Sequence, residues 1–214
     1  AFRVAETGFD PVAIGDENSN RVAACIFESP LTYDHLARPV AMQPLTAEAL
    51  PEVADDFRSF TFRIRPGIFF ADDPAFKGQP RELVAQDYVY AIKRYYDPRN
   101  NSELLYLWEN AGVLDLTELR ERALKEKKPF DYDREVEGIR ALDRYTFSVR
   151  LAKPGPRFAF LFAQTGLAGA IARDRRAPRR CRGVDRGAAP GARQRGGRGR
   201  ALWLFAAAGL PLAR

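Results

Sequence analysis

The sequence has 214 residues, of which 34 are Lys or Arg, 28 are Asp or Glu and one is His, so its formal net charge is +6. A chain of this length can bury a sizeable core, and a hydrophobic content of 46% with 12% aromatic residues is typical of a globular protein. It has no run of about 18 apolar residues, which excludes a membrane-spanning helix, and its two Cys and one His exclude a disulfide framework and a zinc site.

The first elements follow from local signals. Residues 2–6 are predicted to form a short strand, and residues 8–11 (Gly-Phe-Asp-Pro) a turn, because Pro fixes φ and Asp accepts hydrogen bonds from nearby backbone. Either Asp16 or Ser19 can cap a helix that runs to about Phe27. The spacing of the apolar residues in that helix predicts one buried face.

The middle of the chain shows the clearest periodicity. A short strand is predicted over residues 31–33. Residues 59–65 alternate between apolar and polar side chains, which predicts a half-buried strand. Residues 83–96 repeat apolar side chains every three or four positions, which predicts an amphipathic helix that stops at Asp97-Pro98.

The later elements are shorter. Residues 104–108 form a predicted aromatic-rich helix or turn, and residues 116–127 an amphipathic helix with oppositely charged pairs four residues apart. Residues 136–142 are predicted as one or two helical turns, residues 145–151 as a strand, and residues 156–162 as a buried helix. This irregular alternation favours an α/β fold over a helical bundle or a β-sandwich.

The charge is divided between two segments. Residues 171–214 hold 12 Arg and two Asp with no Lys or Glu, a net charge of +10, which leaves −4 on residues 1–170. Arg, Ala, Gly and Pro supply 32 of these last 44 residues, the composition expected when a GC-rich gene is translated out of frame. We favour that interpretation. The alternatives are a natural disordered basic tail and an RNA-binding segment centred on the Arg/Gly run at 195–200.

No catalytic arrangement is visible in the body. Adjacent carboxylates that lie near Pro and Gly are more typical of solvated turns than of an acid–base pair, and the one histidine, His35, follows Tyr33-Asp34 in a predicted turn. No Gly-rich phosphate loop is present. We therefore expect no enzyme activity, no cofactor and no metal site. The carboxylate pairs concerned are Asp55-Asp56, Asp72-Asp73 and Asp131/Asp133.

The order of several segments is more specific than any one of them. The segments are residues 6–11 (ETGFDP), 26–28 (IFE), 31–34 (LTYD), 44–51 (PLTAEALP), 60–70 (FTFRIRPGIFF), 85–94 (AQDYVYAIKR) and 141–151 (ALDRYTFSVRL), followed by Pro154 and Pro156. Over about residues 2–165 this succession resembles the family 5 solute-binding proteins of ABC importers. The family's next motif, a Gly-Thr-Gly-Pro loop, is absent, and Thr165-Gly166 leads directly into the basic segment.

The resemblance implies a fold and a function. It implies that residues 1–170 are part of the first lobe of a two-lobed, type 2 periplasmic-binding-protein fold, truncated, and that residues 171–214 are a disordered or out-of-frame tail. Such proteins lie outside the cytoplasmic membrane, in the periplasm or at the cell surface. They deliver a peptide-like solute to the membrane subunits of an importer. The resemblance further implies that this chain cannot bind solute alone, and that any leader peptide is missing from it.

The resemblance also assigns candidate ligand-binding residues. Glu17, Asn18 and Ser19 match the family's ligand-facing loop before the first helix, and Tyr106 and Trp108 match the aromatic wall against the solute. We expect no nucleic-acid partner for the acidic body. The alternative function is that of an RNA-associated protein acting through the C-terminal Arg/Gly-rich tail.

Overall fold

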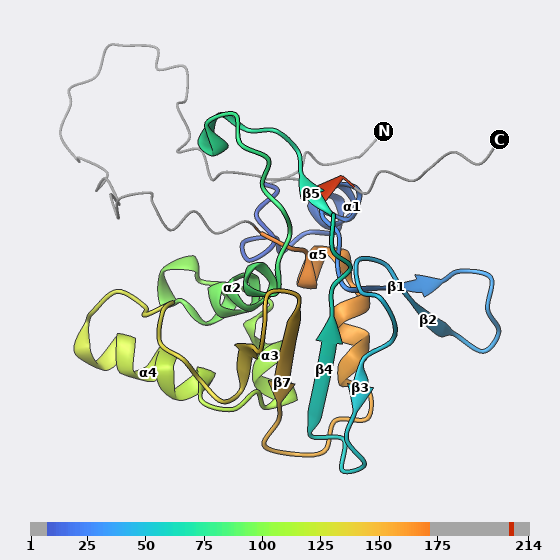
Figure 1. The fold of residues 1–214 in the computed structure, drawn as a ribbon. Helices are drawn as coiled ribbons and strands as arrows, with labels where there is room; N and C mark the ends of the chain where they lie inside the picture. Colours follow the sequence, from blue (N-terminus) through green and yellow to red (C-terminus); the bar gives the residue numbers. More distant parts are fainter. Residues whose placement is uncertain (1–7, 172–205, 208–214) are drawn as a thin grey trace.

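The structure is a computed structural model that describes residues 8–171 and 206–207 of the chain (Figure 1). Its elements in chain order are α1 (Glu17–Ile26), β1 (Leu31–Asp34), β2 (Ala41–Pro44), β3 (Glu52–Val53), β4 (Ser59–Arg63), β5 (Phe69–Phe70), η1 (Pro74–Phe76), α2 (Ala85–Tyr96), η2 (Pro98–Asn100), α3 (Leu105–Ala111), α4 (Leu116–Glu126), β6 (Ile139–Ala141), β7 (Thr146–Arg150), η3 (Phe158–Ala163), α5 (Thr165–Ala168) and β8 (Ala206–Ala207).

A four-stranded antiparallel sheet in the order β3-β4-β7-β6 forms the centre of the fold. The predicted alternation in β4 explains its position, because Phe60 and Phe62 share one face and both are buried. In β7 the residues opposite them, Val149 and Phe147, are buried on the same face. The Phe62 and Phe147 rings stack with centroids 4.9 Å apart, so this cross-strand pair helps to fix the register.

Helix α2 packs against β6 and β7 and supplies much of the core. It begins where the Asp87 carboxylate accepts a hydrogen bond from the backbone N–H of Val84 at 3.0 Å, which stabilises the first turn. Tyr88, Ile92 and Tyr95 lie on its buried face. The apolar face predicted over residues 83–96 is therefore the face that covers the sheet.

Two smaller strand pairs lie outside the central sheet. Strands β1 and β2 form an antiparallel hairpin that projects from the body, and Leu36 at its tip is 91% exposed (Figure 1). Strand β5 pairs with β8, whose two residues belong to the predicted C-terminal tail. The rest of that tail beyond Ile171 lies outside the described residues, as does the opening strand predicted over residues 2–6.

One sequence-based prediction is wrong. Residues 136–142 were expected to be helical, but Ile139–Ala141 form β6, the edge strand beside β7. Gly138 explains the difference, because an added Cβ there would lie 1.9 Å from the backbone oxygen of Leu114. The chain therefore approaches Leu114 closely just before β6, and the hydrogen bonds of this segment are made with β7 rather than within a helix.

The other elements predicted within residues 8–171 are present with shifted ends. The helices predicted over residues 83–96, 104–108 and 116–127 are α2, α3 and α4, and the strand predicted over residues 59–65 is β4. The buried helix predicted over residues 156–162 is the 3-10 helix η3. Strands β2, β3 and β5 were not predicted, because they are two to four residues long and do not alternate clearly.

Candidate functional site

Three of the predicted site residues form the first turn of α1 rather than a loop before it. Asp16 is the N-cap, and its carboxylate accepts a hydrogen bond from the backbone N–H of Ser19 at 2.8 Å. An aspartate at this position satisfies a backbone donor that the helix itself cannot pair. Of the two caps that the sequence allowed, the structure therefore has Asp16, and Glu17 to Ser19 follow it inside the helix.

These three side chains lie in different environments. Ser19 is fully buried, and its Oγ accepts a hydrogen bond from the backbone N–H of Gly8 at 3.5 Å. Glu17 is exposed and forms an ion pair with Arg21 one turn later, at 2.6 Å. Asn18 is half-buried. Glu17 and Asn18 can therefore meet a ligand at the surface, whereas Ser19 supports the helix from within.

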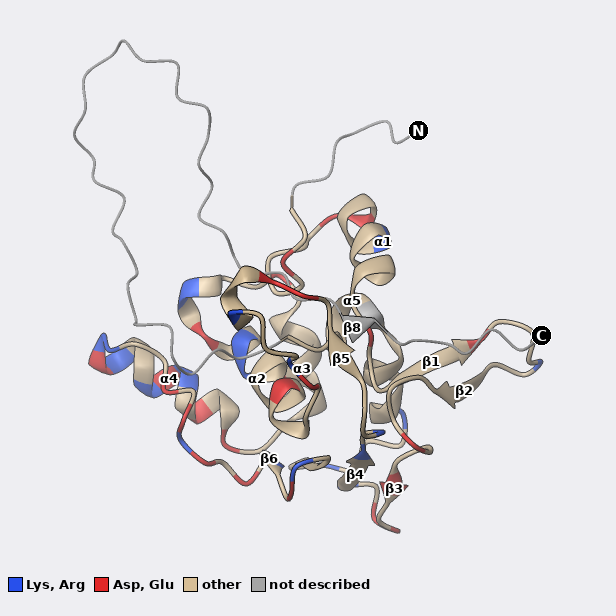
Figure 2. Cartoon of the chain, turned by 45° about the horizontal axis from the view of Figure 1, so that its top comes forward, with Lys and Arg blue, Asp and Glu red and all other residues tan. Residues whose placement is uncertain are grey.

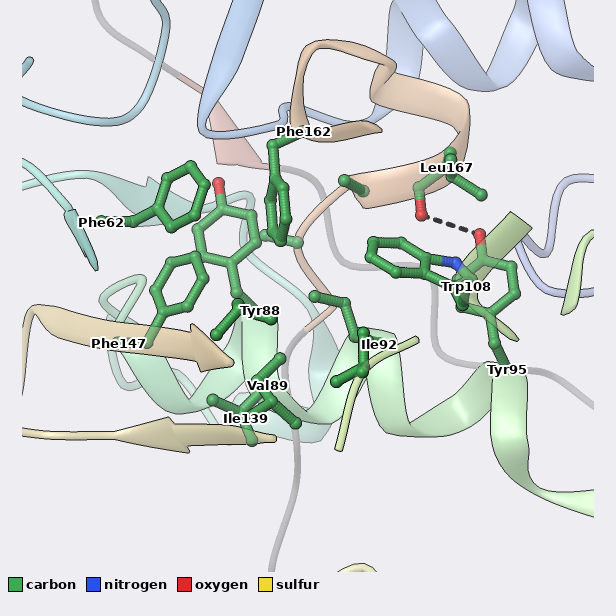
Figure 3. Close-up of a cluster of buried hydrophobic side chains, with 14 of the residues drawn as sticks. Phe62, Tyr88, Val89, Ile92, Tyr95, Trp108, Ile139, Phe147, Phe162 and Leu167 are labelled. Carbon is green, nitrogen blue, oxygen red and sulfur yellow. Dashed lines mark hydrogen bonds between the residues drawn. The ribbon is translucent and has the colours of Figure 1, made fainter. Parts of the chain in front are cut away.

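The two aromatic residues predicted on α3 also differ. Tyr106 is 54% exposed, while Trp108 is fully buried. The Trp108 indole packs edge-on against Phe162 with centroids 5.7 Å apart and lies 5.8 Å from the ring of Tyr95 (Figure 3). Its Nε1 has no hydrogen-bond partner among the residues that the structure describes. Trp108 is therefore a core residue here, and Tyr106 is the member of this pair that faces solvent.

The segments that carry these residues meet just before each helix. An added Cβ on Gly15 would lie 2.2 Å from Oε2 of Glu103, so the backbone before α1 passes directly against the side chain before α3. Glycine permits this approach because it has no side chain. Neither Gly15 nor Glu103 was selected from the sequence, since no short motif marks a contact between residues so far apart in the chain.

Helix α2 holds this region in place. The one hydroxyl proton of Tyr95 is shared between the backbone oxygen of Leu167 at 2.8 Å and that of Pro11 at 3.3 Å. The Arg94 guanidinium pairs with Asp10 at 2.7 Å. Burial alone would lower the pKa of Arg94, but the Asp10 carboxylate outweighs it and raises this pKa, so the guanidinium stays charged.

The described part of the chain offers little support for other chemistry. Within residues 8–171 and 206–207, no group of three His, Cys, Asp or Glu residues is arranged to hold a metal ion. None of the helices in these ranges is long and apolar enough to cross a membrane. The Arg/Gly run at 195–200, on which the RNA-binding alternative depends, lies outside the described residues.

The family model described as bacterial extracellular solute-binding proteins, family 5 (Middle), matches residues 41–178, more than half of the chain. The chain therefore belongs to this family. The family comprises solute-binding proteins and not enzymes, which agrees with the expectation drawn from the sequence.

A curated relative agrees with this family assignment. The chain is 28% identical over 149 residues to the periplasmic oligopeptide-binding protein OppA of Salmonella typhimurium, and this match covers 70% of the chain and 24% of the relative. The chain therefore spans about a quarter of the length of this curated relative.

Solved structures of binding proteins confirm the predicted fold of a periplasmic-binding-protein lobe. Haemophilus influenzae OppA in complex with the peptide RPPGFSPFR matches with a TM-score of 0.60 and 26% identity, over 77% of this chain and 28% of that one. The Escherichia coli murein tripeptide-binding protein MppA matches with a TM-score of 0.57 and 25% identity, over 77% of this chain and 28% of that one.

Proposed function

We propose that the chain contributes to the peptide-binding site of a solute-binding protein that serves an ABC importer. The support is the family membership together with the peptide- and tripeptide-binding relatives that share its fold. Binding of this kind needs a shaped surface with a few polar groups and aromatic walls, and no chemical step. The proposed location is extracytoplasmic, and the proposed partners are a peptide-like solute and the membrane subunits of the importer.

The structural support for this proposal is the contact between Gly15 and Glu103. It brings the first turn of α1 and the start of α3 together, so that Glu17, Asn18 and Tyr106 belong to neighbouring segments. An exposed tyrosine suits a peptide, because its ring packs on side chains while its hydroxyl pairs with backbone groups.

We further propose that these segments form one side of a cleft. Another part of the whole protein would supply the other side. Two-lobed binding proteins close over their ligand by a hinge motion, and each lobe contributes part of the contacts. The 214-residue chain alone should therefore bind peptides only weakly. Calorimetry with a mixed library of short peptides tests this, and micromolar affinity would contradict the need for a second lobe.

The location of the face can be tested even when binding is weak. A tripeptide carrying the photoreactive residue benzoylphenylalanine, irradiated at millimolar concentration with the full chain, is expected to label residues near Glu17 or Tyr106. The Tyr106→Ala variant should lose most of this labelling. An Arg157→Ala variant, altered at an exposed residue that precedes η3, serves as the control. Labelling confined to other segments, or unchanged in Tyr106→Ala, would reject this face.

A further inference from the structure

A groove of about 410 Å³ lies between the C-terminal half of α4 and the loop that follows this helix. Helix α4, which supplies one wall of this groove, lies away from α1 in both ribbon views (Figures 1 and 2), and no residue of α1 or α3 lines the groove. The groove is therefore separate from the proposed peptide-binding face, and the inference below does not rest on the proposed function. The buried side chains of Ala123 and Phe130 line its inner surface, and charged side chains line its rim.

The two carboxylates on the rim already have partners. Glu126 pairs with Lys128 at 2.9 Å. Asp131 accepts hydrogen bonds from the backbone N–H groups of Asp133 at 3.1 Å and Arg134 at 3.2 Å. Each carboxylate is thus occupied within its own short segment.

The two guanidinium groups on the rim, by contrast with these carboxylates, lack such partners in the described part of the chain. Within the residues that the structure describes, the side chains of Arg122 and Arg134 make neither a hydrogen bond nor an ion pair, although Lys128 and, more weakly, Arg122 lower the pKa of the Glu126 carboxyl. Each guanidinium presents several N–H donors in one plane, a geometry that matches a carboxylate. The rim therefore offers more donors than its own acceptors use.

Hydrogen bonds from helix α2 fix the backbone of the loop that carries Arg134. The Nζ of Lys93, a buried residue of α2, donates hydrogen bonds to the backbone oxygens of Arg134 at 2.7 Å and Tyr132 at 3.2 Å. The Tyr132 hydroxyl donates to Asp97 at 2.8 Å, and its ring packs edge-on against Phe130 with centroids 5.1 Å apart. Because the backbone is fixed, a ligand would not have to order this wall of the groove.

We propose that this groove binds a single carboxylate attached to an apolar group, with Arg122 and Arg134 donating to the carboxylate and Phe130 in contact with the apolar part. The neighbouring carboxylates of Glu126 and Asp131 favour a monoanion, because they repel a more highly charged ligand such as phosphate. The small apolar surface around Phe130 and Pro129 favours a carboxylate with a hydrocarbon or aromatic body.

The ligand class is tested with the full chain and N-acetyl-L-phenylalanine as the probe, by NMR titration or calorimetry at pH 7. N-acetyl-L-phenylalanine amide has the same apolar body without the charge, and inorganic phosphate has charge without the body. We expect the carboxylate to bind at least about tenfold more tightly than either, as charge-assisted hydrogen bonds imply. Equal binding of the amide, or no binding of the carboxylate, would overturn the proposal.

Variants test the residues. Arg122→Gln and Arg134→Gln should each weaken carboxylate binding by about tenfold, while Lys153→Gln, which removes the same charge from an exposed position in a different loop, should not. Glu126→Gln should strengthen binding, because it removes a competing negative charge. All four positions are exposed, so the fold should survive, and circular dichroism checks this. Unchanged affinity in both arginine variants would reject the site.

The carboxylate could belong to a free small molecule or to a protein partner. A blocked peptide with one internal Glu next to Phe distinguishes the two sources. Binding that depends on Arg134 would support the site and assign it to a partner's side chain. If only N-acetyl-L-phenylalanine binds, the site is supported as one for free carboxylates. If the peptide binds independently of both arginines, the proposal fails.

Discussion

The hydroxyl of Tyr95 donates a hydrogen bond to the backbone oxygen of Leu167 across 2.8 Å in the buried core (Figure 3). The same hydroxyl lies 3.3 Å from the backbone oxygen of Pro11, so one side chain of α2 joins segments from both ends of the described body. Burial raises the pKa of Tyr95, so the hydroxyl keeps its proton and remains a donor. The residues leading into α1 are thereby tied to α2 and α5.

Replacing Tyr95 by Phe should destabilise the protein by about 1–3 kcal/mol, because two buried carbonyl groups lose their donor. The free energy of unfolding from urea denaturation measures this loss. Tyr106→Phe removes a hydroxyl from an exposed tyrosine and should change the free energy by less than about 0.5 kcal/mol. Equal effects in the two variants would show that the bonds of Tyr95 do not hold these segments.

Replacing Lys93 by Met should loosen the loop that follows α4. The methionine keeps most of the buried hydrocarbon but loses both hydrogen bonds to the backbone oxygens of Tyr132 and Arg134, at a cost of about 1–3 kcal/mol. Hydrogen exchange should quicken in residues 131–137 more than elsewhere. Lys125→Met, at an exposed position on α4, is the matched control and should leave exchange in this loop unchanged.

Asp97 should make stability depend on acid pH. Burial opposes its charged form, but hydrogen bonds from Arg99 and Tyr132 outweigh burial and lower the pKa of Asp97. A lowered folded-state pKa contributes stability above the unfolded value of about 3.9, and this contribution disappears as the pH falls through the folded-state pKa. The wild type should therefore be more stable than Asp97→Asn at pH 7, and this difference should shrink towards pH 2.

The comparison requires unfolding free energies of both proteins at several pH values. Asp72→Asn, at an exposed carboxylate, provides the control and should leave the pH profile close to that of the wild type. A difference between the wild type and Asp97→Asn that stays constant from pH 7 to pH 2 would contradict the assignment.

Replacing Gly138 by Ala should cost about 1–3 kcal/mol, the range found for overpacked sites. The new methyl group would lie 1.9 Å from the backbone oxygen of Leu114, and backbone cannot move aside as a flexible side chain can. Gly8→Ala is the control, since nothing lies within 4 Å of its added Cβ. Thermal unfolding of both variants measures the effect, and a midpoint for Gly138→Ala equal to that of the wild type would contradict the close contact.

Elements with a strong local pattern were predictable. The periodicity over residues 83–96 and the alternation over residues 59–65 follow from burying one face of a helix or strand, so both appear as α2 and β4. Strand β6 was not predictable in this way. Its three residues, Ile139–Ala141, are extended because β7 lies beside them, and that neighbour is not visible in the local sequence.

The candidate site, too, was predictable from the sequence only in part. The order of the motifs located the first turn of α1 and the α3 segment, and the interpretation of these residues as ligand contacts remains a prediction. The sequence could not separate Tyr106 from Trp108, since both are large aromatic residues two positions apart. On a short helix these positions point in different directions, so one faces solvent and the other packs on Phe162.

The sequence by itself determined the family, the main helix and strand, and the division of charge between an acidic body and a basic C-terminal segment, because each is carried by residue order or composition. Only the tertiary structure decided which side chains are buried and which distant segments meet. The approach of Gly15 to Glu103 and the groove between Arg122 and Arg134 depend on packing between elements, and packing is a property of the folded chain.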